Sequence, residues 1–181
     1  MTVLFFLLDT VFFALVAAAL LRAWMNTQRV RMTQQPGPFV MALTNWLVMP
    51  LRRVLPRRWA QHNLDFGSLL AALVLVALYA LCYALVAQGL GAFGGATWLV
   101  WLPLLAGKML LRCGFQLIML LAFVYAILSW VQPQASVQYL LARLIDPLVA
   151  PIRRVLPTIG GVDLSLLVLI VLMQIGLIWI G

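Results

Sequence analysis

The sequence predicts an all-α membrane protein with four transmembrane helices, arranged as two parallel two-helix repeats that each carry a cytoplasmic amphipathic interfacial helix. Three observations predict this fold class: an apolar composition, four long apolar runs and a duplicated seven-residue motif. Of the 181 residues, 66% are hydrophobic and 9% are charged, whereas soluble domains are about 45–50% apolar and about 25% charged. The chain therefore has too little polar surface for a soluble enzyme or regulator, and its hydrophobicity excludes disorder.

Four apolar runs are long enough, or nearly so, to cross the hydrocarbon core, which takes about 20 helical residues. They are expected at residues 3–23, 66–86, 114–131 and 164–180. Residues 97–107 could be re-entrant, interfacial or the start of the third span. Pro103 and the two tryptophans Trp98 and Trp101 favour the interface or a shallow re-entry, because tryptophan is typical of membrane interfaces. Lys108 and Arg112 are then expected at the membrane surface, on one helix face.

The basic residues are distributed unevenly among the loops. Seven arginines lie from Arg22, at the end of the first span, up to the start of the second span, and three lie between the third and fourth, whereas residues 87–97 contain none. Because basic loops remain on the cytoplasmic side, both arginine-rich loops are expected in the cytoplasm and both termini outside. The net charge of +8 is thus explained by topology, and no nucleic-acid partner is predicted, since the basic residues do not alternate with aromatic ones.

A duplicated motif divides the chain into two repeats, residues 1–88 and 89–181. The motif reads P-L-R-R-V-L-P at residues 50–56 and P-I-R-R-V-L-P at residues 151–157. Each half contributes two spans, and an even number of spans returns the chain to its starting side. The halves therefore have the same orientation and are expected to be related by a pseudo-two-fold axis along the membrane normal.

Around each motif the apolar residues fall on one arc of a helix and the arginines fall outside it. Amphipathic helices are expected at residues 39–55 and 147–156, with the apolar arc in the acyl boundary and the arginines at the phosphates. Asp146 followed by Pro147 predicts the start of the second of these helices, because acidic N-caps and a first-turn proline favour helix initiation.

The motif arginines are the candidate binding residues. They are expected to hold anionic lipid head groups or a partner protein, or merely to set the topology. The four residues are Arg52, Arg53, Arg153 and Arg154.

The other charges of interest are expected to be structural or to form ion pairs. They are Asp9, Asp65, Asp146, Asp163, Lys108 and Arg112. Asp9 is the one acid inside a predicted span, where an ionisable residue is a functional candidate. It is expected to approach the interface, to line an ion or proton pathway, or to pair with Lys108 or Arg112. Asp65 and Asp163 are expected to be helix caps or partners of the motif arginines rather than catalytic carboxylates.

The sequence contains no catalytic or metal-binding constellation. It has no glutamate, a single histidine at His62, and two separated cysteines, Cys82 and Cys113, that are expected to be small buried hydrophobic residues. It also lacks nucleotide-binding and metalloprotease motifs. We therefore expect no enzyme activity, no cofactor and no metal.

The duplicated motif, Asp146-Pro147 and the segment G-G-V-D-L-S at residues 160–165 resemble the YggT family of small bacterial and plastid membrane proteins. The resemblance covers nearly the whole chain as two family repeats, although Asn45-Trp46 replaces Asp-Pro in the first. It implies a bacterial cytoplasmic (inner) membrane protein linked to osmotic-stress tolerance. Relatives are linked to cell division and to haem attachment to cytochrome b, but one loop histidine does not provide a haem site.

Two functions are compatible with these features. The first is a non-enzymatic scaffold or assembly factor that binds anionic lipids and membrane-protein partners, or forms a homo-oligomer, through the amphipathic arginine helices. The alternative is a small channel or transporter for ions or osmolytes. The two differ in whether a continuous polar cavity crosses the bundle with Asp9 or Lys108 on its wall, and we expect no such cavity.

Overall fold

A computed structural model describes residues 1–181 except for 1, 31, 34–35, 56–64, 90–97 and 156–162. The described residues form six helices and no strand: α1 (Thr2–Thr27), α2 (Gly37–Val54), α4 (Phe66–Gly89), α5 (Trp98–Val131), α6 (Ser136–Arg153) and α7 (Leu164–Ile180). Three of them, α1, α4 and α5, are long and apolar enough to cross a membrane, and α7 is a shorter apolar helix. The protein is therefore all-helical, as the composition predicts.

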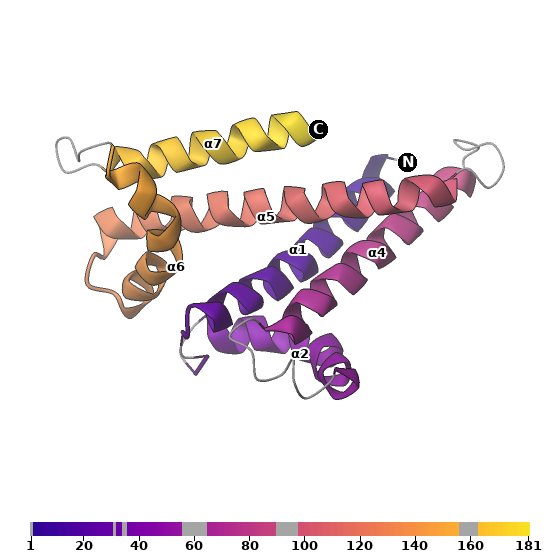
Figure 1. The fold of residues 1–181 in the computed structure, drawn as a ribbon, viewed down its shortest axis with the longest axis horizontal. Helices are drawn as coiled ribbons and strands as arrows, with labels where there is room; N and C mark the ends of the chain where they lie inside the picture. The colour runs from indigo at the N-terminus through magenta and orange to yellow at the C-terminus, as the bar shows by residue number, and fades with distance from the viewer. Residues whose placement is uncertain (1, 31, 34–35, 56–64, 90–97, 156–162) are drawn as a thin grey trace.

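The helices form two units of the same order along the chain (Figure 1). In the first unit α1 and α4 lie side by side and α2 packs against both of them. In the second unit α5 and α7 lie side by side and α6 contacts both. The units meet where α5 packs along α4 and against α1. In Figure 1, α2 and α6 lie toward one end of the bundle, whereas the N-terminus and the adjoining ends of α4 and α5 lie toward the other.

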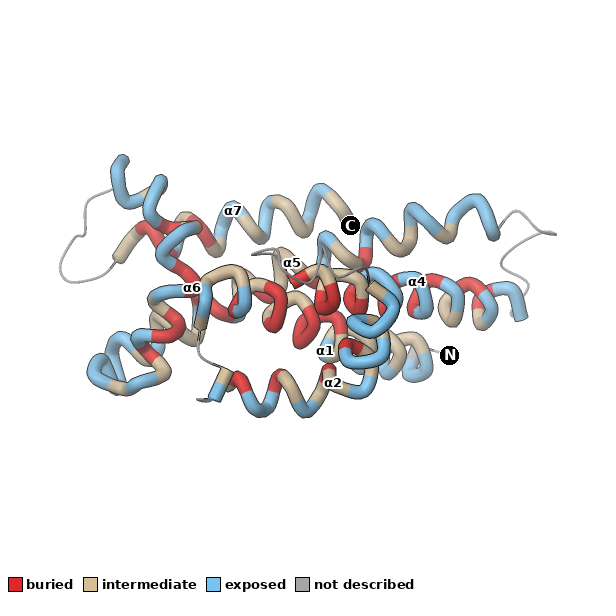
Figure 2. Tube along the Cα trace, turned by 60° about the horizontal axis from the view of Figure 1, so that its bottom comes forward, coloured by how far each residue is buried: buried red, intermediate tan, exposed pale blue. Residues whose placement is uncertain are grey.

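The buried core lies around α1, where it packs against α4 of its own unit and against the second unit, as the central red segments of Figure 2 show. Ala17 belongs to a cluster with residues of α5, α6 and α7, whereas Val16 and Ala19 belong to a cluster with residues of α4 and α5. Small side chains allow helix backbones in a membrane to approach closely, so the alanine run of α1 suits this central position. Cys113 is also buried in the core, whereas Cys82 is half-buried.

The expectation of a separate interfacial or re-entrant segment before the third span is wrong. Trp98 and the residues that follow form the first turns of α5, which continues through Pro103 to Val131. A proline near the start of a helix removes one hydrogen bond from a helix that retains many others, so the helix can continue. At about 1.5 Å per residue, α5 is about 51 Å long, which exceeds the hydrocarbon thickness of about 30 Å.

The second amphipathic helix begins earlier than expected. Asp146 and Pro147 lie in the interior of α6, which starts at Ser136, instead of capping a helix at residue 147. Leu141, Leu144 and Ile145 are buried, and they continue the helical apolar spacing upstream of the proline. Burial of this extended face outweighs the hydrogen bond that Pro147 removes.

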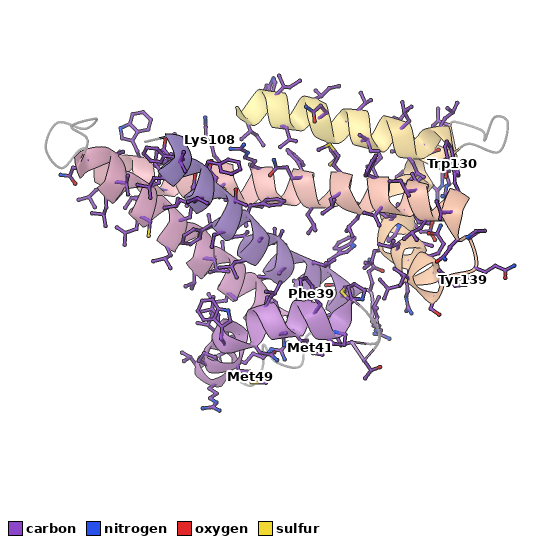
Figure 3. The ribbon with its side chains drawn as sticks, turned by 180° about the vertical axis from the view of Figure 1, so that it is seen from behind. Phe39, Met41, Met49, Lys108, Trp130 and Tyr139 are labelled. Carbon is purple, nitrogen blue, oxygen red and sulfur yellow. The ribbon has the colours of Figure 1, made fainter. Side chains whose placement is uncertain are left out.

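Only part of the predicted apolar arc of α2 is covered by the protein, since Val48 is buried whereas Val54 is 82% exposed. Val40, Thr44 and Val48 are buried against the first unit. Phe39 and Met49 lie on the opposite, exposed face, as Figure 3 shows. The observed helix, Gly37–Val54, otherwise agrees closely with the expected range of 39–55.

Candidate functional site

The first arginine of the first motif forms an ion pair with the aspartate that precedes α4. Arg52 Nη2 lies 2.6 Å from Asp65 Oδ2. The carboxylate of Asp65 also accepts hydrogen bonds from the backbone N–H of Ser68, at 3.2 Å, and from its hydroxyl, at 2.7 Å. Gly67 makes room for this arrangement, because a Cβ atom there would lie 2.5 Å from Arg52 Cγ. We call Arg52, Asp65 and Ser68 the first junction.

The carboxyl group of Asp65 is buried yet remains ionised. Burial opposes ionisation, but the hydrogen bonds from Ser68 and the positive charge of Arg52 outweigh it and hold the pKa of Asp65 below its ordinary value. Asp65 therefore serves both as an N-terminal cap of α4 and as the anion that fixes Arg52.

The second motif forms the same type of ion pair before α7. Arg153 Nη2 lies 2.6 Å from Asp163 Oδ2, and Asp163 Oδ1 accepts a hydrogen bond of 3.0 Å from the backbone N–H of Ser165. Arg153 Nη1 also donates to Asp146, at 3.0 Å. Burial lowers the pKa of Arg153, but hydrogen bonding to Asp163 and its negative charge outweigh burial and raise this pKa above its ordinary value. We call Arg153, Asp163 and Asp146 the second junction.

The two arginines of each motif have different structural roles. The first arginine, Arg52 or Arg153, is held by carboxylates of the chain. The second, Arg53 or Arg154, is exposed, and its side chain has no ion pair or hydrogen bond among the described residues. Pro56 and Pro157, which complete the motifs, lie outside the described residues. Of the four candidate binding residues, Arg53 and Arg154 are thus the ones with guanidinium groups available for a ligand.

Arg22 is a polar residue of this region that the sequence interpretation assigned to topology alone. Its side chain is buried, and its Nη1 donates to Thr44 Oγ1 at 2.7 Å and to Asn45 Oδ1 at 2.9 Å. Asn45 aligns with Asp146 of the second repeat, so this position accepts from an arginine in both repeats. The signal in the sequence is a lone arginine at the end of an apolar run, since such a charge requires polar partners.

A direct contact links the two units near the junctions. Trp24 at the end of α1 donates its indole N–H to the carbonyl oxygen of Leu144 in α6, at 3.1 Å. Met25 packs with Leu140 and Leu144 in a small buried cluster. Because the end of α1 contacts both α2 and α6, the two junctions lie at the same end of the bundle.

A polar cavity of about 560 Å³ lies at the other end of the bundle, and we call it the distal cavity. Its wall comes from α1, α4, α5 and α7 and includes polar or charged Asp9, Tyr79, Tyr83, Lys108, Arg112, Gln116 and Gln174. A smaller cavity of about 220 Å³ shares Asp9, Arg112 and Gln116 with it. Asp9 and Lys108 both lie on the wall of this cavity, but its described lining residues come from one end of the bundle, so it is not the continuous polar cavity across the bundle that would distinguish a channel.

Asp9 is bound by a tyrosine rather than by a basic residue. The hydroxyl of Tyr79 donates to Asp9 Oδ1 at 2.7 Å. No ion pair within 4 Å joins Asp9 to Lys108 or Arg112, and neither cation has an ion pair or hydrogen bond among the described residues. Lys108 lies near the N-terminal end of α1 (Figure 3). The described residues contain no group of three or more histidine, cysteine or acidic residues that could hold a metal ion.

Three long apolar helices and a fourth shorter one, arranged in two units with equivalent ion pairs, define a multi-pass membrane protein built from a duplicated unit. The CCB3/YggT family profile matches residues 1–86 and 104–180, and the chain belongs to this family. The two matched segments correspond closely to the two units of the structure.

Relatives of the chain occur in several bacteria. The chain is 36% identical over 177 residues to the "Uncharacterized protein YggT" of Escherichia coli (strain K12), which covers 97% of this chain and 87% of that protein. It is 33% identical over 170 residues to an "Uncharacterized protein in proC 3′region" of Vibrio alginolyticus, covering 93% and 88%. It is 28% identical over 167 residues to the "Uncharacterized protein PA0392" of Pseudomonas aeruginosa, and this match covers 91% of this chain and 81% of that protein. No solved structure matches the chain.

Proposed function

We propose that the protein is a non-enzymatic scaffold or assembly factor of the bacterial inner membrane. In this proposal it binds anionic lipids and membrane-protein partners, or another copy of itself, through Arg53 and Arg154 and contributes to envelope assembly and osmotic-stress tolerance. One observation carries the proposal: in both units the first motif arginine is fixed by carboxylates, while the side chain of the second is exposed and has no ion pair among the described residues. The fixed arginine orders the backbone, and its neighbour is thereby presented for binding.

In this proposal all four apolar helices cross the membrane, and the two units are parallel repeats with their junctions at the cytoplasmic face. Helix α7 has 17 residues, which corresponds to about 26 Å at about 1.5 Å per residue. That length approaches the hydrocarbon thickness of about 30 Å. The motif arginines Arg52, Arg53, Arg153 and Arg154 lie at the end that carries α2 and α6, which is consistent with the positive-inside rule.

The test removes the two exposed arginines and retains the two fixed ones. The variant Arg53→Gln/Arg154→Gln is compared with Arg53→Lys/Arg154→Lys, which keeps both positive charges. Crosslinking and mass spectrometry in native membranes would measure captured membrane proteins, and survival after hyperosmotic shock would measure function. We expect fewer crosslinks and lower survival with glutamine and near-normal values with lysine. Unchanged crosslinks and survival in a normally inserted glutamine variant would refute the proposal.

The distal cavity favours a second candidate, a small channel or transporter for ions or osmolytes. Its wall carries a carboxylate and two cations, and charged groups of this kind mark ion and substrate pathways in membrane proteins. The test is flux of ions and osmolytes through purified protein in liposomes, compared with the Asp9→Asn variant. Flux that depends on Asp9 would support this candidate, and the absence of flux in both proteins would refute it.

A further inference from the structure

The distal cavity contains two cations that form no ion pair with the described part of the chain. Lys108 and Arg112 both line the cavity, and they are four residues apart on α5. This spacing places their Cβ atoms about 6 Å apart on one helix face. Neither forms an ion pair with a described residue. An anion from outside the chain would therefore meet two cationic ligands on one helix face.

The third charge of the cavity wall is already engaged. One carboxylate oxygen of Asp9 accepts a hydrogen bond from the hydroxyl of Tyr79. The formal charge of the wall is therefore +1, from Lys108 and Arg112 against Asp9. A ligand with one negative charge would neutralise this wall. A phosphodiester carries that charge, and its oxygens accept the hydrogen bonds that guanidinium and ammonium groups donate.

The position of the cavity matches the head-group level of a bilayer. Measured along α5 from Val131, Arg112 lies about 28 Å away and Lys108 about 34 Å away at about 1.5 Å per residue. The hydrocarbon core is about 30 Å thick. If Val131 marks one boundary of the core, the two cations lie at the opposite boundary, where lipid phosphates are found.

Apolar residues at the end of α7 favour a lipid over a free anion. Ile178 lines the cavity and is 72% exposed, and the adjacent Trp179 is 91% exposed. Tryptophan at a helix end is typical of the membrane interface. Gln116 and Gln174 add hydrogen-bonding groups to the wall, and the volume of about 560 Å³ lies within the range of about 300–1,000 Å³ for ligand sites.

We propose that the distal cavity binds the phosphodiester head group of an anionic phospholipid from the leaflet opposite α2 and α6, with Lys108 and Arg112 as its cationic ligands. This site is separate from Arg53 and Arg154, which lie at the other end of the bundle. The glycerol and phosphate oxygens contact the cations and glutamines inside the cavity, and the acyl chains extend along the exposed apolar face of α7.

The experiment measures retained lipid in a background that lacks the two arginines of the proposed site at the other end of the bundle. The full chain carrying Arg53→Gln/Arg154→Gln is placed in phosphatidylcholine nanodiscs with increasing phosphatidylglycerol, and native mass spectrometry counts the bound phosphatidylglycerol. Adding Lys108→Gln/Arg112→Gln is expected to weaken the remaining saturable site about twenty-five-fold, the product of about fivefold for each cation near a membrane surface. Adding Asp9→Asn instead is expected to tighten the site, because it removes the negative charge of the wall.

Two controls keep the result interpretable. The exchange Lys108→Arg/Arg112→Lys retains both charges and is expected to bind within about threefold of the background protein, which shows that loss in the glutamine variant is not misfolding. A parallel titration adds inorganic phosphate to the background protein in the nanodiscs that contain phosphatidylglycerol. Unchanged phosphatidylglycerol retention in the Lys108→Gln/Arg112→Gln protein would overturn the proposal, and so would inorganic phosphate that displaces the lipid at millimolar concentration.

Discussion

Replacement of Arg52, which breaks its ion pair with Asp65, is expected to destabilise the protein more than replacement of any other motif arginine. The proposed change is Arg52→Gln, which removes the charge and leaves a polar side chain of similar length. The side chain of Asp65 is 4% exposed and that of Arg52 is 47% exposed. Breaking a fully buried pair costs about 3–5 kcal/mol, and an exposed pair contributes about 0.2–1 kcal/mol. A half-exposed arginine on a buried carboxylate is therefore expected to contribute about 2 kcal/mol.

The second repeat supplies internal comparisons for this estimate. Arg153 pairs with Asp163, whose side chain is 18% exposed, and with Asp146, whose side chain is 52% exposed. Because these carboxylates are better hydrated, Arg153→Gln is expected to cost about 1 kcal/mol. Arg53→Gln removes an exposed guanidinium without a partner among the described residues, so its expected effect is within about 0.5 kcal/mol.

The assay is reversible unfolding by sodium dodecyl sulfate in mixed micelles at neutral pH, followed by circular dichroism. It compares the free energies of unfolding of the three single variants with that of the parent protein. The expected order of destabilisation is Arg52→Gln, then Arg153→Gln, then Arg53→Gln. Equal destabilisation by Arg52→Gln and Arg53→Gln would show that the ion pair does not stabilise the fold, and a larger effect of Arg153→Gln would show that burial does not set its strength.

Three further results are expected. The pKa of Asp65 is lowered in the folded protein, so the ionised carboxylate should stabilise the fold fully above its ordinary pKa of about 3.9 and lose this effect as the pH falls through the lower folded value. The difference in unfolding free energy between the parent and Asp65→Asn should therefore shrink on acidification. A difference that grows instead would contradict this expectation. Gly67→Ala should displace the side chain of Arg52, because the new Cβ would lie 2.5 Å from its Cγ, and the cost of a later Arg52→Gln change should be smaller in that background, as a double-mutant cycle would measure. Gly176→Ala should destabilise the protein by about 1–2 kcal/mol, because the new Cβ would lie 2.7 Å from the ring of Phe115 in α5. Gly114→Ala, whose Cβ meets nothing within 4 Å, should be neutral or stabilising by up to about 1 kcal/mol. The same unfolding assay would show whether the two alanine variants differ in this way.

Local sequence signals located most of the helices but were less accurate for some of their ends. Residues 66–86 and 164–180 were expected as spans, and the structure has α4 at Phe66–Gly89 and α7 at Leu164–Ile180. The start of α6 was misplaced because Asp146-Pro147 is a strong local initiation signal, which burial of Leu144 and Ile145 overrides. The start of α5 was misplaced because Pro103 and the basic residues after it suggested a break that the helix does not make.

The candidate site could be predicted in part because its aspartates lie at fixed positions in the repeats. Asp65 and Asp163 each precede an apolar run and follow an arginine pair, so a cap or an arginine partner was a natural expectation. The sequence alone did not distinguish Arg52 from Arg53, since neighbouring residues differ in direction by about 100° on a helix. That distinction depends on how α2 packs against α4.

By itself, the sequence determined that this is a membrane protein with an all-helical fold and a duplicated basic motif, because apolar run length and repeated residue order are properties of the chain. The tertiary structure alone decided which charges meet. It brought Tyr79 to Asp9, Thr44 and Asn45 to Arg22, and Lys108 and Arg112 to one cavity wall formed by four helices. Contacts between residues far apart in the chain depend on the helix packing that buries the most apolar surface, and no local pattern encodes that choice.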